Sequence, residues 1–341
     1  MRVLITGHNG YIGQVLDPML QSFGHDVVGL DTFFFEGCQF DEAPTGSRTL
    51  RKDIRDVQAA DLEGFDAIVF LAALSNDALG DLDPGLTVEI NHSATVRFAQ
   101  LAKQAGVQRF IFSSSCSLYG AAEGDELLTE ESPMNPVTAY GKAKIDVERE
   151  LVKLADDHFS PTYMRNATAY GLSPSLRIDL VVNNLTGYAY TTGEVLMKSD
   201  GSPWRPLVHV EDIAAAMRAV LESPRDPIHN QAFNVGQTDE NYQIRDVARI
   251  VQEVVPNSVI KFAEGAEPDK RNYRVSFDKI CEEIPTYQPQ WNVRQGVEEL
   301  YKAYQAHGLT VDELNSSKYL RIKTILGHRN AGRLDPALRW S

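Results

Sequence analysis

The sequence has few cysteines, no long apolar run and no excess of positive charge, and each shortage argues against a class of protein. Its 341 residues include only Cys38, Cys116 and Cys281, a small odd number that argues against a disulfide framework. A formal net charge of −14 argues against nucleic-acid binding. The apolar run 67–74 is far too short to cross a bilayer. We therefore expect a cytoplasmic protein with no nucleic-acid or membrane partner, and we predict no metal site.

The first part of the chain alternates short apolar segments with amphipathic ones. The opening "MRVLITG" has the pattern of a strand and lacks the layout of a signal peptide. The predicted strands span residues 2–6, 26–31, 67–73, 109–115, 161–167 and 232–236. The predicted helices lie near residues 11–23, 85–105 and 138–156. This alternation, with strands apolar on both faces, predicts an α/β fold with a doubly wound parallel sheet.

A glycine-rich segment follows the first predicted strand. In "TGHNGYIG", Gly7, Gly10 and Gly13 form the pattern G-x-x-G-x-x-G directly before a predicted helix. Glycine is needed there for a tight turn and for close approach of the backbone to a pyrophosphate, which the helix N-terminus attracts. The alternative is a flexible turn without a ligand, but the strand before and the helix after are the context that the motif requires. The segment therefore predicts a dinucleotide site.

Asp31 ends the second predicted strand, 18 residues after Gly13. A carboxylate at this place accepts hydrogen bonds from the adenosine ribose hydroxyls and repels a 2′-phosphate. The following "TFFFEG" contains no arginine or lysine that would receive such a phosphate. The sequence therefore favours NAD over NADP. The alternative role of Asp31 is only to begin a turn.

The segment "YGKAK" places Tyr140 one helical turn before Lys144, so the two side chains share a helix face. A redox step on an alcohol needs a base, and a tyrosine, whose ordinary pKa is about 10, needs a nearby positive charge to act at neutral pH. Lys144 supplies that charge. Ser115 ends a predicted strand, where doubly wound sheets bind ligands, and is the candidate to hold the substrate oxygen. The alternative for the neighbouring serines, Ser113 and Ser114, is that they satisfy their own backbone.

Several further motifs occur in order along residues 1–305. They are "KDIRD", "FLAALS", "FIFSSSCSLYG", "YGKAK", "LVVNNL", "RPLVHVEDIA" and "FNVG". Together with the glycine-rich segment, they make the chain resemble the extended short-chain dehydrogenases/reductases of the nucleotide-sugar epimerase/dehydratase type. The resemblance implies a Rossmann-type sheet, bound NAD and a nucleotide-diphosphate-sugar substrate.

The resemblance also implies roles for individual residues. It implies a catalytic triad of Ser115, Tyr140 and Lys144. Besides Tyr140 and Lys144, the implied cofactor-binding residues are Gly7, Asn9, Gly10, Tyr11, Ile12, Gly13, Asp31, Asp53, Ile54, Leu71, Ala72 and Ala73. The implied substrate-binding residues are Ser75, Ser117, Asn166, Thr168, Asn184, Arg205 and Arg271. An arginine beside a diphosphate is also what charge-assisted bidentate bonding favours.

Two interleaved domains and a homodimer are further implications. The expected segments are 1–168 and 206–236 for the NAD-binding domain, 169–205 and 237–308 for a smaller nucleotide-sugar-binding domain, and 309–341 for a C-terminal extension. The extension caps the pocket, joins a partner or packs as a surface helix, and we favour the surface helix. The two long helices after the third and fourth strands are expected to pair in the dimer, a common closed arrangement.

The residues that follow Ser115 bear on the choice of reaction. Dehydratases of the family follow the catalytic hydroxyl with an Asp-Glu pair, whereas this chain has Cys116 and Ser117 there, which disfavours dehydration. Some reductases and multi-position epimerases have a cysteine two positions after the hydroxyl, where Ser117 stands here. A cysteine acid/base is therefore also disfavoured, and Cys116 is more typical of a small core residue.

We therefore predict an NAD-dependent epimerase acting at C4. Tyr140 would remove the hydroxyl proton as hydride passes to NAD⁺, and the 4-keto sugar would turn over before hydride returns to its other face. The runner-up is a 4-ketoreductase or sugar dehydrogenase with the same triad, followed by a 4,6-dehydratase. A non-enzymatic dinucleotide sensor ranks last, because such a protein is expected to lose Tyr140 or Lys144.

Some positions depart from the family pattern and leave the nucleotide base and the sugar open. Family members often have Asn where Thr168 stands and Asp where Pro206 stands. The usual downstream arginine is not cleanly aligned, because "PDKRNYR" offers Lys270, Arg271 and Arg274.

Overall fold

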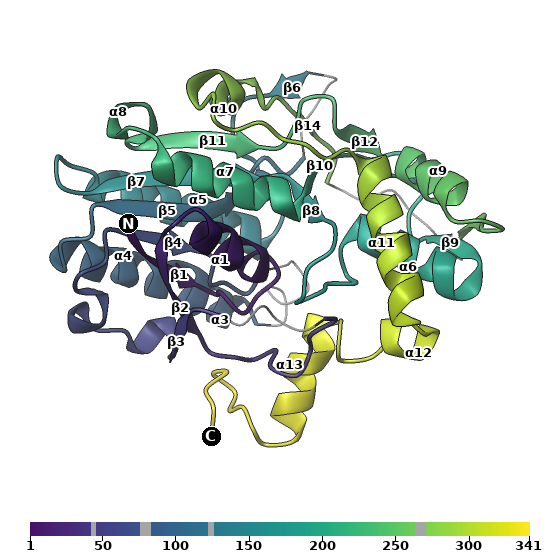
Figure 1. Ribbon diagram of the computed structural model, residues 1–341, viewed down its shortest axis with the longest axis horizontal. Helices are drawn as coiled ribbons and strands as arrows, with labels where there is room; N and C mark the ends of the chain where they lie inside the picture. Colours follow the sequence, from purple (N-terminus) through teal and green to yellow (C-terminus); the bar gives the residue numbers. More distant parts are fainter. Residues whose placement is uncertain (42–45, 76–82, 122–125, 264–270) are drawn as a thin grey trace.

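The centre of the protein is a sheet of seven parallel strands. The computed structural model describes the chain except residues 42–45, 76–82, 122–125 and 264–270 (Figure 1). The strand order is β11-β7-β5-β4-β1-β2-β3. These strands are β1 (Arg2–Thr6), β2 (Asp26–Asp31), β3 (Arg48–Arg51), β4 (Ala67–Phe70), β5 (Arg109–Ser115), β7 (Ser160–Asn166) and β11 (Gln231–Val235). The order reverses between β1 and β4, which makes their carboxyl ends a switch point where doubly wound sheets bind ligands. The predicted fold class is confirmed.

The central strands are apolar throughout because both faces of the sheet are covered. In β1, Val3 and Ile5 belong to one hydrophobic core, while Leu4 between them belongs to the other. The first core includes side chains of α1 (Gly13–Ser22), α7 (Val210–Glu222) and α10 (Asp278–Glu283). The second core includes side chains of α4 (Thr95–Gln104) and α5 (Ala139–Leu154).

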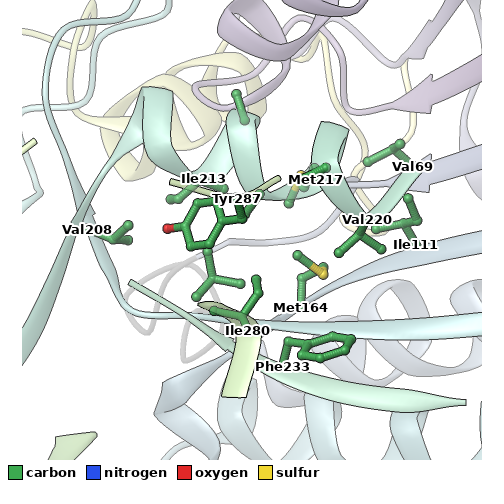
Figure 2. Packing of buried hydrophobic residues seen from close by; sticks show 14 of the residues in the cluster. Val69, Ile111, Met164, Val208, Ile213, Met217, Val220, Phe233, Ile280 and Tyr287 are labelled. Carbon is green, nitrogen blue, oxygen red and sulfur yellow. The ribbon is translucent and has the colours of Figure 1, made fainter. Parts of the chain in front are cut away.

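Figure 2 shows the packing of α7 in the first core. Ile213, Met217 and Val220 of this helix lie on the side that faces Ile111 and Met164 of the sheet. Their spacing of four and three residues is the spacing of one face of an α-helix. An apolar stripe of this kind fixes the helix on the sheet.

The structure differs from the predicted elements in one helix and in one strand that was not predicted. The single helix predicted near 85–105 consists of α3 (Pro84–Thr87), a π-helical turn η3 (Val88–Ala94) and α4. The edge strand β3 was missed because its side chains are mostly exposed, so it lacks the apolar run that marks the inner strands.

The other elements belong mainly to the second half of the chain. A third core draws on α6 (Val181–Thr192), β9 (Glu194–Met197), α9 (Ile244–Val254), α11 (Val293–His307) and α12 (Val311–Leu314). The core also includes residues of β8 (Thr168–Tyr170) and β10 (Trp204–His209), and β12 (Asn241–Gln243) and β13 (Val259–Phe262) pack against it. Shorter or terminal elements are η1 (Ile54–Asp56), η2 (Ala59–Leu62), η4 (Cys116–Leu118), β6 (Leu127–Leu128), α8 (Arg225–Ile228), β14 (Arg274–Val275) and α13 (Arg321–Asn330). The domain boundaries stay a prediction. Among the described residues, no helix is long and apolar enough to cross a membrane.

Candidate active site

A cavity of about 820 Å³ lies at the carboxyl ends of the central strands. The predicted site residues that line it are Gly7, Gly10, Tyr11, Ile12, Gly13, Asp31, Asp53, Ile54, Leu71, Ala72, Ala73, Ser75, Ser115, Ser117, Tyr140, Lys144, Asn166, Thr168, Asn184, Arg205 and Arg271. Asn9 is not among the lining residues. Its side-chain oxygen instead accepts a hydrogen bond of 3.2 Å from Gln14 in α1.

The glycine loop leaves room for a ligand against its backbone. Gly7 has φ +71°, a conformation that favours glycine, and a Cβ on Gly13 would lie 2.4 Å from the carbonyl oxygen of His8. Within the described part of the chain, the amides of Tyr11, Ile12 and Gly13 donate to no protein acceptor. These amides lie at the positive end of α1, which suits a pyrophosphate. The loop therefore fits a dinucleotide cofactor.

Asp31 begins the turn after β2, which is the alternative role considered for it, and it also lines the cavity, where ribose binding stays a prediction. Its Oδ1 accepts a hydrogen bond of 2.7 Å from the amide of Phe33, and its Oδ2 accepts one of 3.1 Å from the amide of Asn9. Burial raises the pKa of Asp31, although both amides and His8 oppose the rise. The carboxylate thus joins the turn after β2 to the glycine loop while its residue still lines the cavity.

Asp53 and Ile54 line the cavity at the start of η1. Both carboxylate oxygens of Asp53 accept hydrogen bonds from the Arg55 side chain, the shorter contact being 2.7 Å to Nη2. This pair holds η1 in place, and the buried Ile54 offers an apolar surface. An apolar surface of this kind suits the flat face of a nucleotide base.

The start of α5 positions Tyr140 and Lys144. Thr138 caps the helix, because its Oγ1 accepts a hydrogen bond of 3.1 Å from the amide of Gly141. The Lys144 Nζ lies 5.4 Å from the centroid of the Tyr140 ring. The same Nζ donates a 2.6 Å hydrogen bond to the carbonyl oxygen of Ser113 in β5. The helix thus brings the tyrosine and the lysine to the strand that carries the serine.

Lys144 is buried in an environment that disfavours its charge. Burial lowers the pKa of the Lys144 ammonium to about 7, although the Glu148 carboxylate opposes the fall. The Nζ also lies 4.6 Å from the centroid of the Phe112 ring. The burial of Lys144 therefore disfavours the positive charge that its ammonium carries.

Ser115 stands at the end of β5, beside the end of β7. Its hydroxyl donates to the Ser117 hydroxyl and accepts from the Ser117 amide, both at 3.1 Å. Asn166 pairs with it in register and donates a 3.0 Å hydrogen bond to the Ser113 hydroxyl. Among the described residues, the buried Oδ1 of Asn166 has no hydrogen-bond partner. A polar acceptor of this kind, in the wall of a cavity, is available to a ligand.

Ser113 and Ser114 bond to side chains rather than only to their own backbone, so the simple strand-end interpretation of them was wrong. The Ser114 hydroxyl donates a 2.5 Å hydrogen bond to Glu148. Cys116 is buried, its thiol donates to the carbonyl oxygen of Arg165 at 3.1 Å, and burial raises its pKa well above the ordinary value. An un-ionised thiol is a poor acid/base at neutral pH, which agrees with our interpretation of it as a core residue.

Positively charged side chains gather on another part of the wall. Arg205 donates to the carbonyl oxygen of Trp204 at 2.8 Å and to that of Arg271, and both arginines line the cavity. Arg274 does not line it, since its guanidinium lies 5.0 Å over the Trp204 ring. Lys270 lies outside the described residues.

Sequence reasoning missed three residues of the site. Arg177 lines the cavity, and its Nη2 is paired with Asp179 at 2.5 Å. Asn91, buried in η3, exchanges hydrogen bonds with the backbone of Leu74 and so fixes the segment after β4. Arg321, at the start of α13, also lines the cavity. The helix α13 is packed through Ile325 and exposed at Leu326, as expected of a packed surface helix, and its first residue lines the cavity in addition. Asn91 alone had a signal in the sequence, as a polar residue on an apolar helix face.

Comparisons with known proteins agree with this arrangement. Residues 3–236 match the model of the NAD dependent epimerase/dehydratase family. A UDP-glucose 4-epimerase of Corynebacterium glutamicum is 28% identical over 325 residues, which cover 90% of this chain and 97% of that relative. UDP-glucuronic acid decarboxylase 2 of Arabidopsis thaliana is 25% identical over 316 residues, or 89% of this chain and 68% of that relative. The solved structure of MoeE5 in complex with UDP-glucose and NAD has a TM-score of 0.76 and 25% identity, covering 91% of this chain and 100% of the other.

A doubly wound parallel sheet, a glycine loop and polar residues gathered at the switch point define a dinucleotide-dependent enzyme class. The chain belongs to the NAD dependent epimerase/dehydratase family, and its cofactor is NAD. Within the described residues, no group of three or more histidine, cysteine, aspartate or glutamate side chains is arranged to hold a metal ion.

Proposed function

We propose that the protein is an NAD-dependent epimerase that inverts C4 of a nucleotide-diphosphate sugar through a transient 4-keto intermediate. One observation carries the proposal: Tyr140, Lys144 and Ser115 line one cavity without a carboxylate acid/base beside the serine. The two residues after Ser115 are the buried Cys116 and the hydroxyl of Ser117. The site therefore has what oxidation of an alcohol needs and lacks the pair that dehydration needs.

The proposed roles follow from the chemistry of each side chain. When bound, NAD supplies the acceptor and the donor of a hydride. Tyr140 takes the proton of the C4 hydroxyl and later returns it, and the charge of Lys144 stabilises the phenolate form. Ser115 donates a hydrogen bond to the substrate oxygen and holds it beside Tyr140.

The substrate is proposed to be anchored at its diphosphate. Arg205 and Arg271 supply the positive charges, and Asn184 lines the same cavity. The Asn166 Oδ1, which has no partner among the described residues, is suited to accept a hydrogen bond from a sugar hydroxyl and not from the diphosphate. An anchor at the diphosphate leaves the hexose able to turn over within the cavity. UDP-hexoses are the first substrates to test, because the named relatives act on UDP-sugars.

The experiment is a panel of UDP-, GDP-, CDP- and dTDP-sugars incubated with the purified protein without added NAD. The proposal predicts that one sugar is converted to its C4 epimer and that no free NADH appears. Stoichiometric NADH with a stable keto product would establish the ketoreductase or dehydrogenase alternative. Loss of water would establish a dehydratase, and loss of carbon dioxide from a UDP-uronic acid would establish a decarboxylase.

We also propose a cytoplasmic homodimer that pairs α4 and α5 of each copy. These two helices pack against each other on one face of the sheet. Val152 on α5 is 47% exposed, and Val88 at the start of η3 is 52% exposed. Exposed apolar side chains on neighbouring helices support an interface between two copies.

A further inference from the structure

The C-terminal segment after α12 is packed onto the cofactor half of the protein. Figure 1 shows this segment in yellow, turning through α13 towards the end of the sheet that carries β2 and β3. Ile325, Leu334 and Leu338 are buried in the second core. Arg55, the partner of Asp53, donates to the backbone carbonyl of Leu338 at 3.2 Å. The segment is therefore a fixed part of the fold.

The segment also holds the turn that follows β2. The Trp340 Nε1 donates a 2.6 Å hydrogen bond to the carbonyl oxygen of Thr32. The His328 Nε2 lies 2.9 Å from the carbonyl oxygen of Phe34. This turn begins at Asp31 and lines the cavity through Thr32 and Phe34. The C-terminal segment thus supports the part of the cavity where an adenosine ribose is expected.

α13 begins at the cavity wall. Leu320 and Arg321, the N-cap and the first residue of this ten-residue helix, both line the cavity. Leu320 offers no side-chain acceptor to the first turn, and the Lys323 amide donates to the carbonyl oxygen of Leu320. Among the described residues, the amides of Arg321 and Ile322 donate to no protein acceptor, so these two can bind an anion. A helix N-terminus alone does not make a site, but here it carries a buried cation.

The Arg321 guanidinium is only partly satisfied by the protein. The residue is 3% exposed, its Nη2 donates to Ser175 Oγ at 2.5 Å, and its Cζ lies 3.9 Å from the centroid of the Phe35 ring. The buried Nη1 has no hydrogen-bond partner among the described residues. Buried charged donors are normally paired, so the unpaired Nη1 of a residue that lines the cavity indicates a missing acceptor.

The charges around Arg321 indicate that this acceptor is an anion. Burial and the nearby Arg177 guanidinium lower the pKa of Arg321 to about 10, even though Asp31 and Asp179 act in the opposite direction. Arg177 already has Asp179 as its counter-ion, whereas Arg321 forms no ion pair with the described residues. A pyrophosphate carries two negative charges and would supply the counter-charge that Arg321 lacks.

We propose that Arg321 and the first turn of α13 bind the pyrophosphate of NAD together with the glycine loop, so that the C-terminal segment retains the cofactor. The cofactor is favoured over the substrate as ligand because Arg321 stacks on Phe35 in the turn after β2. Arg205 and Arg271 supply cations from another part of the chain. The inference depends on NAD binding and not on which reaction follows.

The test compares Arg321→Met with Arg329→Met, which removes the same charge from the far end of the same helix. Bound NAD is quantified in the purified holoenzymes, and its release is followed by chase with labelled NAD. We expect Arg321→Met to release NAD roughly tenfold faster or more, since a charged hydrogen bond is lost. Arg329→Met should match the unmodified protein. Release within twofold of the unmodified protein for Arg321→Met would overturn the proposal.

A second measurement separates contact with phosphate from mere support of the fold. ADP-ribose, adenosine and UDP are each used to displace bound NADH, with fluorescence as the signal. Arg321→Met should lower the affinity for ADP-ribose and leave the affinity for adenosine unchanged. Arg321→Lys should restore part of the affinity for ADP-ribose. The proposal would be contradicted if Arg321→Met lowered the affinities for ADP-ribose and adenosine equally, or if it lowered only the affinity for UDP. These readouts need no turnover, so they stand even if epimerisation is not observed.

Discussion

Lys144 meets two opposing demands at the scale of a single residue. The proposed chemistry needs its positive charge beside Tyr140, whereas its burial lowers its pKa to about 7. Buried residues that destabilise the fold are typical of functional sites, because their positions serve the reaction and not the stability of the protein. Tyr140 depends on this charge, so the two residues make separate and testable predictions.

Tyr140→Phe removes the proposed base and keeps the packing of the ring. We expect turnover to fall by at least about 100-fold, the usual range for loss of a general acid/base. Binding of the sugar nucleotide should change little. Ser115→Ala should lower turnover by less, roughly tenfold, because it removes a positioning hydrogen bond and leaves the base. Steady-state kinetics and calorimetric binding check both. Retained turnover in Tyr140→Phe would exclude this residue as the base.

Lys144→Met should make the protein more stable, and by an amount that depends on pH. The folded-state pKa of Lys144 is about 7, below the ordinary value near 10.4, so between these values the unfolded chain binds more protons. The free energy of unfolding therefore rises with pH across this window, and the cost of burying the lysine is greatest below about pH 7. Thermal unfolding should show a midpoint raised by a few degrees at pH 6.5 and by less at pH 9.5.

The exposed Lys142, on the same helix, provides the matched control. Lys142→Met should leave the unfolding midpoint nearly unchanged at both pH values. If Lys144→Met raised the unfolding midpoint by the same amount at pH 6.5 and pH 9.5, the lowered pKa of Lys144 would be contradicted.

At the scale of an element, α5 is held to the sheet by a buried ion pair. Glu148 on α5 and Arg165 on β7 lie 2.8 Å apart, and both residues are 4% exposed. Glu148 also accepts the hydrogen bond from Ser114, one residue before Ser115. The pair therefore sets the position of the helix that carries Tyr140 relative to the strand that carries the serine.

Glu148→Ala leaves Arg165 buried without its counter-ion. We expect a loss of about 3–5 kcal/mol in the free energy of unfolding, as is usual when one partner of a buried pair is removed. Denaturant unfolding measures it. The control is Glu150→Ala, which removes an exposed ion pair between Glu150 and Lys153 on the same helix. It should have little effect on the free energy of unfolding. A similar small effect of both variants would show that the buried pair does not anchor α5.

Elements with a strong local signal were predictable, and contacts between distant segments were not. The glycine loop, the inner strands and α5 are marked by glycine spacing, apolar runs and helical periodicity, so their positions agree with the predictions. The break into a π-helical turn at η3 has no such mark. Arg321 reaches Ser175, 146 residues away in the chain, and this approach depends on packing that periodicity does not describe.

At the scale of the whole molecule, the proposed dimer predicts a specific mass in solution. Sedimentation at micromolar concentration should show two copies. Val152→Glu places a charge at the proposed interface and should shift the protein towards the monomer. Val259→Glu, at a comparably exposed valine on β13, should not. A monomer in the unmodified protein would contradict this assembly.

The cavity draws its wall from both halves of the chain and from the C-terminal segment. The central claim is that hydride leaves C4 and returns to it within this one cavity. The most direct measurement follows a sugar nucleotide that carries deuterium at C4, in ordinary water and without added NAD. The account predicts that the C4 epimer forms and keeps the deuterium. An epimer that has lost the deuterium to solvent, or a keto product with free deuterated NADH, would contradict it.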